Sequence, residues 1–534
     1  MDRAFDYVVV GAGSAGCVVT NRLATTGADI LLLEAGKDAS SILLKMPAGF
    51  AYASKNPSFD WGLSSESEPY LGGRTMPCPR GKVVGGSSAV NAMAFVRGHP
   101  LDFADWAQQA GSEWSYVNCL PYFKKLETFS RGADAFRGGS GPLKIKAPEY
   151  SNPLYGYFLK ACQQAGYDLS PDTNGATMTG FGPMDQCIDK GRRSSSSTAY
   201  LDPIRGFSNF SLRTGVQATR ILLENGRATG VEYRSIQGTG IVFAQREVIL
   251  CAGAVHSPTL LMLSGIGDSD HLSRFGIRTE LNRPSVGKHL QDHVDVTVRQ
   301  LCPLPITESK ALRADQRLLI GMEWLLFKKG RGATNHFEVG GYIETRHGLD
   351  RPNIQLCFMP LLVSYDGAPA LGHRHGYQIS VMLLQPTSRG TVELASSDPL
   401  AAPKLTFNYL TNKDEVSQLS EGIQAVRSIL SQPAMEKFRG VELAPGVSSN
   451  GAVEKFIRET AKSTHHVCGT CRMGLNDDAV VDWQGRVRGI RSLRIADSSI
   501  IPKITSGNIN APTVMLAEKI SDMIVHDGSQ SLTN

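Results

Sequence analysis

The sequence predicts an α/β protein in which a Rossmann-like nucleotide-binding domain is joined to a second domain, built on a mainly antiparallel sheet with flanking helices. Three observations support this fold class. The first residues read as a strand, a glycine-rich turn, a helix and a second strand. The turn carries three glycines at the spacing GxGxxG. Further along, residues 353–363, 376–385 and 390–394 are short β-rich runs separated by turns, which is typical of antiparallel sheets.

Composition excludes several classes of protein. The chain has 534 residues, of which 41% are hydrophobic and 20% charged, as in ordinary soluble globular proteins. A net charge of +5 over this length is too diffuse to indicate a nucleic-acid surface. No apolar run approaches the ~20 residues of a membrane-spanning helix, so we expect no transmembrane segment, while peripheral contact with a membrane stays open. Neither a signal peptide nor a disulfide framework is visible, which favours a cytoplasmic protein.

The N-terminal unit begins with residues 5–10, an apolar β-branched and aromatic run typical of a buried parallel strand. Residues 17–24 repeat apolar side chains at helical spacing, and residues 29–34 form a second strand that ends in Glu34. In the turn between strand and helix, Gly11 allows the tight bend, Gly13 lets a pyrophosphate approach the backbone, and Gly16 lets helix and strand pack closely. Ser14 and Ala15 then face the phosphates at the helix N-terminus.

The acid at the end of the second strand specifies the cofactor further. Glu34 follows Gly16 by eighteen residues and is placed to bind a ribose hydroxyl of an adenosine. A carboxylate there would repel the additional phosphate of NADP. The fingerprint alone does not distinguish NAD from FAD.

The remaining elements follow from periodicity and turn residues. We expect helices over 152–168, 414–431, 452–461 and 511–526, and strands within 212–251 with turns at Asn225–Gly226 and Gly238–Gly240. Ser257–Pro258 fits a helix start, and residues 260–263 fit core packing. The serine run 194–197 is expected to be a solvated loop.

Four segments carry a resemblance to a known family. They are GKVVGGSSAVNAMAFVRGHPLDFA at 81–104, GAVHSPTLLMLSGIG at 253–267, HVCGT at 466–470 and GNINAP at 507–512. In this order they resemble the signatures and catalytic segments of the glucose–methanol–choline (GMC) oxidoreductases, which bind FAD. The resemblance implies that FAD is the cofactor and that the FAD domain is discontinuous, formed by residues 1–154, 201–298 and 465–534. The substrate domain would comprise residues 155–200 and 299–464.

The resemblance also implies cofactor-binding positions. Beside the N-terminal turn and Glu34 these are Ala35, Val83, Gly86, Asn91, Ala92, Met93, Ala94, Val216, Asp497 and Asn510. Gly85–Ser88 is a bend without room for bulky side chains. Some family members link a histidine covalently to the flavin. Val90 occupies that position here, which implies non-covalent FAD.

Catalytic roles follow from the same resemblance. His466 matches the family's catalytic histidine, and a histidine suits a general base because its ordinary pKa lies near 6.5. Asn510 matches the second catalytic position, where it would hold the substrate oxygen. The adjacent His465 is a rival for the base, or a packing residue beneath the site. Cys468 and Cys471 form a CxxC without a second ligand pair, so we expect no metal site.

The predicted activity is FAD-dependent oxidation of a primary alcohol to an aldehyde, with oxygen or a quinone as electron acceptor. Two alternatives stay open: a hydroxynitrile lyase that retains FAD without redox turnover, and a non-catalytic flavin-binding protein. Glu338 resembles the position where choline-oxidising relatives place a carboxylate against the trimethylammonium head. Choline is therefore an alternative substrate to a neutral alcohol, unless Glu338 only fastens a loop.

Overall fold

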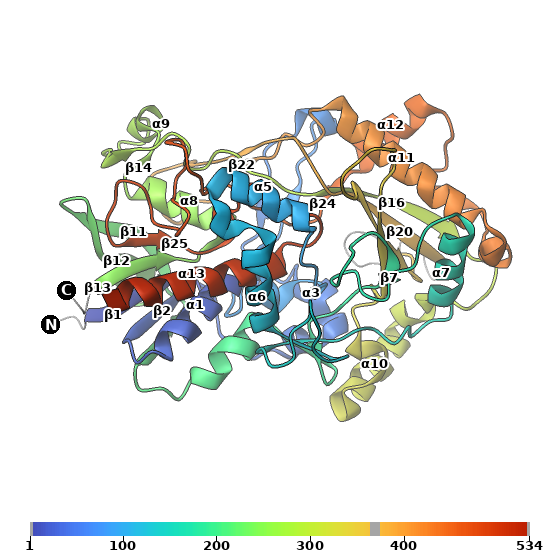
Figure 1. Cartoon of the computed structure of the whole chain (residues 1–534), viewed down its shortest axis with the longest axis horizontal. Helices are drawn as coiled ribbons and strands as arrows, with labels where there is room; N and C mark the ends of the chain where they lie inside the picture. The colour runs from blue at the N-terminus through green and yellow to red at the C-terminus, as the bar shows by residue number, and fades with distance from the viewer. Residues whose placement is uncertain (1–3, 364–373, 531–534) are drawn as a thin grey trace.

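The computed structural model describes residues 4–363 and 374–530 of the chain. One seven-stranded sheet contains the N-terminal strands (Figure 1). Its order is β10 (Phe210–Thr214), β2 (Ile30–Glu34), β1 (Ala4–Val10), β13 (Gly238–Leu250), β12 (Arg227–Ser235) and β11 (Gln217–Glu224), with β25 (Leu493–Ile495) also on β13. Strands β10, β2, β1, β13 and β25 run parallel, whereas β11 and β12 pair antiparallel. This confirms the predicted Rossmann-like unit.

Burial on both faces explains the composition of these strands. All five residues of β2 are buried, and Val8, Val9 and Val10 of β1 lie between Leu31–Leu33 and Val248–Leu250. Helix α1 (Ser14–Ala24) follows the glycine turn, and α13 (Asn510–Gln530) runs beside it in Figure 1. The helix that closes the chain therefore returns to the cofactor-binding unit that opens it.

The second sheet is antiparallel throughout, as predicted. Its order is β23 (Glu442–Ala444), β16 (Val294–Leu301), β20 (Gly376–Leu383), β18 (Ile354–Met359), β17 (Val339–Ile343) and β7 (Gly180–Pro183), with β24 (Lys462–Ser463) also on β16. Helices α7 (Leu154–Gln164), α11 (Lys413–Leu430) and α12 (Asn450–Thr460) flank it (Figure 1). The predicted domain boundary at residue 298 falls inside strand β16, which belongs as a whole to this sheet. The division into domains otherwise stays a prediction.

The two faces of the second sheet have different partners. Ile354, Leu356, Ile379 and Val381 belong to the apolar core formed with α11, whose Gly422 leaves room for Val381. Alternate residues point the other way, because successive strand side chains alternate between faces. Asp295, Gln355, Cys357, Ser380 and Met382 line a cavity on that opposite face. The sheet thus carries a core on one side and a site wall on the other.

Local predictions were wrong at several positions. The second turn of the 212–251 region falls at Ile236–Gln237, and Gly238 already opens β13. Residues 390–394 do not join the second sheet, because β21 (Thr391–Glu393) pairs with β22 (Lys404–Thr406). Helix α8 (Gly253–Leu263) begins before Ser257–Pro258, so Pro258 lies inside it.

The serine run is also buried rather than solvated. Ser194–Ser197 are at most 7% exposed. Ser196 N donates to Ser88 Oγ at 3.0 Å, and the hydroxyls of Ser195 and Ser197 lie 2.9 Å apart. The Ser195 and Ser197 hydroxyls thus bond to each other, whereas Ser196 Oγ is buried without a partner among the residues the structure describes, so the cost of burying the run is only partly offset.

Three further expectations concern cysteines, metals and membranes. All ten cysteines are free thiols, as expected. No group of metal-binding side chains occurs in residues 4–363 and 374–530. Within the same residues, no helix is both long enough and apolar enough to cross a bilayer.

Candidate active site

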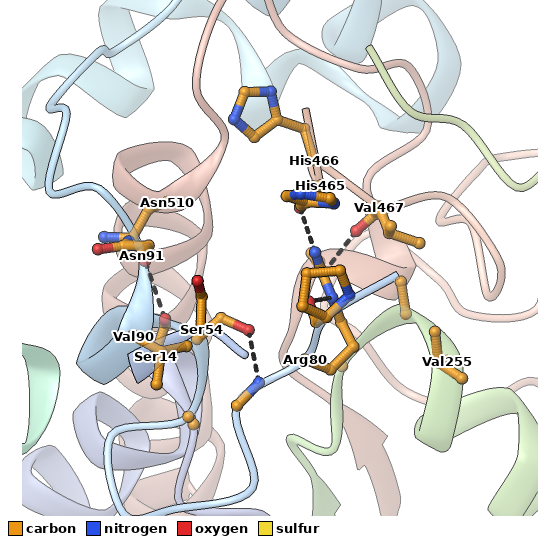
Figure 2. A pocket seen from close by; sticks show the side chains of 18 of the residues that line it. Ser14, Ser54, Arg80, Val90, Asn91, Val255, His465, His466, Val467 and Asn510 are labelled. Carbon is orange, nitrogen blue, oxygen red and sulfur yellow. Dashed lines mark hydrogen bonds between the residues drawn. The ribbon is translucent and has the colours of Figure 1, made fainter. Parts of the chain in front are cut away.

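A cavity of about 830 Å³ lies between the glycine-rich turn, the bend near residue 90 and the second sheet. Figure 2 shows Ser14, Asn91 and Asn510 on one side of it, and His465, His466 and Arg80 on the other. The cavity is therefore bounded by segments from the beginning, middle and end of the chain.

The glycine-rich wall is shaped by close backbone approaches. A Cβ atom on Gly11 would lie 2.7 Å from the carbonyl oxygen of Cys251, and one on Gly16 would lie 1.9 Å from that of Gly11. Gly86 has a φ of +52°, and a Cβ there would lie 2.6 Å from Cα of Gly13. The predicted bend at residue 86 thus rests directly on the N-terminal turn, and the two loops form one continuous backbone surface.

Glu34 ends β2 and lines the cavity, as predicted from the sequence. Its carboxylate accepts hydrogen bonds from the backbone N–H groups of Ala12 and Gly36, both at 2.8 Å. Burial raises its pKa to about 7. Glu34 therefore fastens the turn, and its contact with a ribose stays a prediction.

His466 is held by a chain of hydrogen bonds. Its backbone N–H donates to Asp292 Oδ1 at 2.6 Å. Its ring Nδ1 lies 2.9 Å from Nδ1 of His293, and its Nε2 lies 2.9 Å from the amide nitrogen of Asn508. On the far side, Nε2 of His293 lies 3.2 Å from the carbonyl oxygen of Leu384.

These partners determine where the protons of the two imidazoles lie. The Leu384 carbonyl can only accept, so Nε2 of His293 carries a hydrogen and its Nδ1 accepts. Nδ1 of His466 then donates to His293, which leaves the lone pair of His466 Nε2 to accept from Asn508. Burial lowers the pKa of His293 to about 4 and the pKa of His466 well below its ordinary value. Both rings are therefore neutral at pH 7, with the basic nitrogen of His466 beside Asn508 at the cavity.

Comparison with known proteins identifies this architecture. Family models described as GMC oxidoreductase match residues 5–295 and 386–517. The chain belongs to the GMC oxidoreductase family. It is similar to oxygen-dependent choline dehydrogenases from Vibrio vulnificus (44% identity, 98% of this chain and 95% of the relative) and Brucella suis (43%, 97% and 95%). This GMC oxidoreductase is accordingly an FAD-dependent enzyme that acts on CH–OH donors.

Solved structures agree with this assignment. Pyridoxine 4-oxidase from Mesorbium loti superimposes with a TM-score of 0.89 at 30% identity, over 98% of this chain and 99% of that one. A formate oxidase of Aspergillus oryzae superimposes with a TM-score of 0.93 at 26% identity, over 99% and 100%. The fold of this GMC oxidoreductase is therefore shared over nearly its whole length.

Most of the residues predicted to bind FAD line the cavity of this GMC oxidoreductase. They are Gly11, Gly13, Ser14, Ala15, Glu34, Ala35, Gly86, Asn91, Ala92, Met93, Ala94, Val216, Asp497 and Asn510. Gly16 shapes the turn from behind it. Val83 does not line the cavity, because it packs in a small core with Leu44, Ala53, Ala89 and Val90. At Gly11 and Gly86 neighbouring backbone atoms lie too close for any side chain, so this surface is bare backbone, which fits close approach of the diphosphate of FAD.

Asn510 and Asp497 line the cavity and are each also fixed by hydrogen bonds within the protein. Asn510 accepts a hydrogen bond from Ser14 Oγ at 2.9 Å, so its amide joins the cofactor wall, while Asn508 contacts His466. Asp497 accepts from Gly253 N at 2.8 Å and Ser257 Oγ at 2.6 Å and thereby fastens the start of α8.

Glu338 is 3% exposed and lies outside the cavity lining. Its carboxylate accepts from Ser151 N at 2.6 Å, Ser151 Oγ at 2.9 Å and Thr334 Oγ1 at 2.8 Å. These bonds join two loops, as in the loop-fastening alternative, and a cation-binding role for Glu338 stays a prediction. His465 does line the cavity; its Nδ1 lies 3.1 Å from Ser463 Oγ, and Arg80 donates to its carbonyl at 2.6 Å.

Three residues of the histidine network were missed by sequence reasoning. His293 has no predicted role because it lies 173 positions from His466 in the sequence. In the structure the two rings are in direct contact. Asp292 precedes it and also accepts from Tyr409 OH at 2.5 Å. Asn508 stands in the GNINAP segment, two residues before Asn510. Only the side-chain directions at the start of α13 distinguish the two.

Proposed function

We propose that this enzyme oxidises a primary alcohol to an aldehyde, with His466 as the base that accepts the hydroxyl proton. The observation that carries the proposal is the 2.9 Å contact at the cavity between the amide nitrogen of Asn508, which can only donate, and Nε2 of His466, which must then accept. Bound FAD supplies the hydride acceptor for the substrate carbon. The proton and the hydride together account for both hydrogens that leave the alcohol.

His293 would act as a positioning residue in this reaction. By accepting from Nδ1 of His466 at 2.9 Å, it keeps the proton away from Nε2. When Nε2 takes the substrate proton, Nδ1 can continue to donate to His293. The pair thus orients the base without competing for the proton.

Asn508 is the residue we propose for holding the alcohol oxygen. Its amide nitrogen already donates toward the lone pair of His466, so an incoming hydroxyl oxygen would accept from the same group. Asn510 bonds to Ser14 at the first turn of α1 and would act on the cofactor. This division replaces the role that the sequence suggested for Asn510.

The two asparagines can be separated by substitution. Asn508→Ala should lower kcat for alcohol oxidation by about 10–100-fold with FAD content unchanged, because a lost hydrogen bond to a developing charge corresponds to about 1.5–3 kcal/mol. Asn510→Ala should reduce FAD retention more than kcat of the FAD-loaded enzyme. Steady-state kinetics and flavin absorbance per protein measure both effects. The opposite pattern would return the substrate role to Asn510.

FAD attachment is proposed to be non-covalent. Val90 ends helix α4 (Ser87–Val90) and lines the cavity. Its side chain offers only methyl groups, which cannot form a bond to the flavin. As electron acceptor we propose oxygen, which the names of the oxygen-dependent relatives and the oxidase structures support. Nothing in these comparisons supports hydroxynitrile cleavage.

For the substrate we propose a neutral primary alcohol, with choline as the second candidate because of the named relatives. A quaternary cation needs a carboxylate or aromatic faces. Asp295 is a carboxylate on the cavity-facing side of the second sheet. Its Oδ1 lies 3.6 Å from Lys462 Nζ, and its other oxygen accepts from Ser380. Lysine therefore offsets the charge that a trimethylammonium group would require.

This charge balance predicts substrate preference. Wild-type enzyme should have a kcat/KM for 3,3-dimethylbutan-1-ol at least about tenfold above that for choline, a difference of about 1.4 kcal/mol. Lys462→Met should shift the ratio toward choline, because it uncovers the Asp295 carboxylate. Adding Asp295→Asn to that variant should cancel the shift. A wild-type preference for choline would show that choline is the substrate and that the lysine does not oppose it.

A further inference from the structure

Helix α10 (Ala314–Phe327) presents large apolar side chains to solvent instead of to the core. Six of them are strongly exposed: Leu318 65%, Leu319 52%, Met322 42%, Leu325 50%, Leu326 74% and Phe327 66%. Figure 1 shows α10 at the lower edge of the molecule, and no other described element is drawn below it. Scattered exposed apolar residues are ordinary, but six large ones on a single helix indicate an interaction surface.

The spacing of these residues makes the patch a single stripe. Positions 318, 319, 322, 325 and 326 fall within an arc of roughly 120° when residues advance by about 100° around a helix. Trp324 lies on the other side, is 2% exposed and donates from its indole nitrogen to the carbonyl of Gly191 at 2.6 Å. The helix is therefore fastened by one face and free to bind with the other.

The surroundings of the stripe are basic. Residues 308–331 contain six cations (Lys310, Arg313, Arg317, Lys328, Lys329 and Arg331) and three acids (Glu308, Asp315 and Glu323), a net charge of +3. Two of the acids are already paired, Glu308 with Arg331 at 2.7 Å and Asp315 with Arg313 at 3.1 Å. These 24 residues thus carry +3 of the net +5 of the whole chain.

We propose that α10 docks this enzyme on the surface of an anionic lipid bilayer. An apolar stripe flanked by lysine and arginine is the pattern of helices that lie in the membrane interface, with the stripe in the acyl region and the cations at the headgroups. A second copy of this chain fits less well, because a twofold axis through the stripe would bring the two sets of excess positive charge together. The occupant with complementary charge is the anionic headgroup layer.

Docking through α10 would also orient the cavity. The helix leads through η7 (Gly330–Ala333) to Phe337, which lines the cavity and contacts Phe50 with ring centroids 6.1 Å apart. Gly332 in this connection packs too closely for a side chain. A Cβ there would lie 2.8 Å from both Met46 and Trp324. The docking face and one cavity wall are thereby joined by a short, closely packed segment.

Vesicle co-sedimentation of the FAD-loaded enzyme tests the proposal. With vesicles of phosphatidylcholine and phosphatidylglycerol at roughly 3:1, the enzyme should sediment, and with pure phosphatidylcholine its bound fraction should fall at least about tenfold. The triple variant Leu318→Gln, Leu325→Gln and Leu326→Gln should lose at least about tenfold in partition without any change in charge. Alcohol-dependent flavin reduction in solution should stay at the wild-type rate, which shows that the variant is folded.

The matched control replaces three strongly exposed apolar residues elsewhere: Val117→Gln, Ile236→Gln and Val441→Gln, which are 73%, 101% and 66% exposed. This control should sediment like the wild type. Wild-type enzyme that stays in the supernatant, equal binding to both vesicle types, or an α10 variant that still sediments would each overturn the proposal. A vesicle-free dimer that the α10 variant dissociates, seen by light scattering, would assign the stripe to a second copy instead.

Discussion

Replacing His466 by Ala should lower kcat for alcohol oxidation by about 10²–10⁴-fold while FAD stays bound, because the variant loses its positioned general base. In the Asn508–His466–His293 chain, Nε2 of His466 is the basic ring nitrogen that reaches the cavity, where its lone pair accepts from Asn508. Stopped-flow reduction of the flavin under anaerobic conditions measures the step directly, without interference from reoxidation.

His465→Ala is the matched control for this prediction. His465 also lines the cavity, but burial together with Arg80, Lys462 and Lys55 lowers its pKa to about 3, and its Nδ1 contacts Ser463. We expect the control to keep most of its activity. Burial holds the pKa of His466 below its ordinary range, so its neutral form should persist and kcat/KM should not fall between pH 7.5 and about 6. An inactive His465→Ala with an active His466→Ala would transfer the base role to His465.

Gly86→Ala should yield protein with less than about a tenth of the wild-type FAD, because the dinucleotide surface depends on close backbone contact. The new Cβ would lie 2.6 Å from Cα of Gly13, a backbone atom that cannot rotate away. The backbone of Gly86, with φ +52° and ψ −137°, adds about 1–3 kcal/mol for any residue with a side chain. Absorbance at the flavin band relative to protein, after release of FAD by acid precipitation, measures the loss; the wild type should release its flavin completely.

Gly276→Ala separates the cost of a positive φ from the cost of the clash with the backbone of Gly13. Gly276 has a φ of +67°, but no atom lies within 4 Å of its added Cβ. This control should lose about 1–2 kcal/mol of unfolding free energy and keep its FAD. If Gly86→Ala behaves in the same way, the contact between the two loops does not govern FAD binding.

The parts of the fold that the sequence predicted are those set by local pattern. The run at 5–10, the GxGxxG turn and the apolar repeat of α11 each indicate a structure within a window of a few residues. The serine run was misjudged because its burial depends on partners such as Ser88, more than a hundred positions away.

The candidate site was only partly predictable for the same reason. His466 and Glu34 follow from family motifs, whereas the contact of His293 with His466 requires that β16 and the segment after β24 meet in space. Both Asn508 and Asn510 line the cavity, and the choice between them depends on which side chain contacts His466 and which contacts Ser14. A one-dimensional motif contains both residues and cannot make that choice.

The alternation of β16, β18 and β20 has an evolutionary consequence. On β18, Ile354 and Leu356 pack in the core beneath α11, while Gln355 and Cys357 face the cavity. On β20, Ile379 and Val381 lie in the same core, while Ser380 and Met382 face the cavity. Mutations on one set can therefore accumulate with little effect on the other. A scaffold of this kind can acquire a new alcohol preference without first being stabilised, and libraries restricted to the cavity-facing set should contain a high fraction of folded variants.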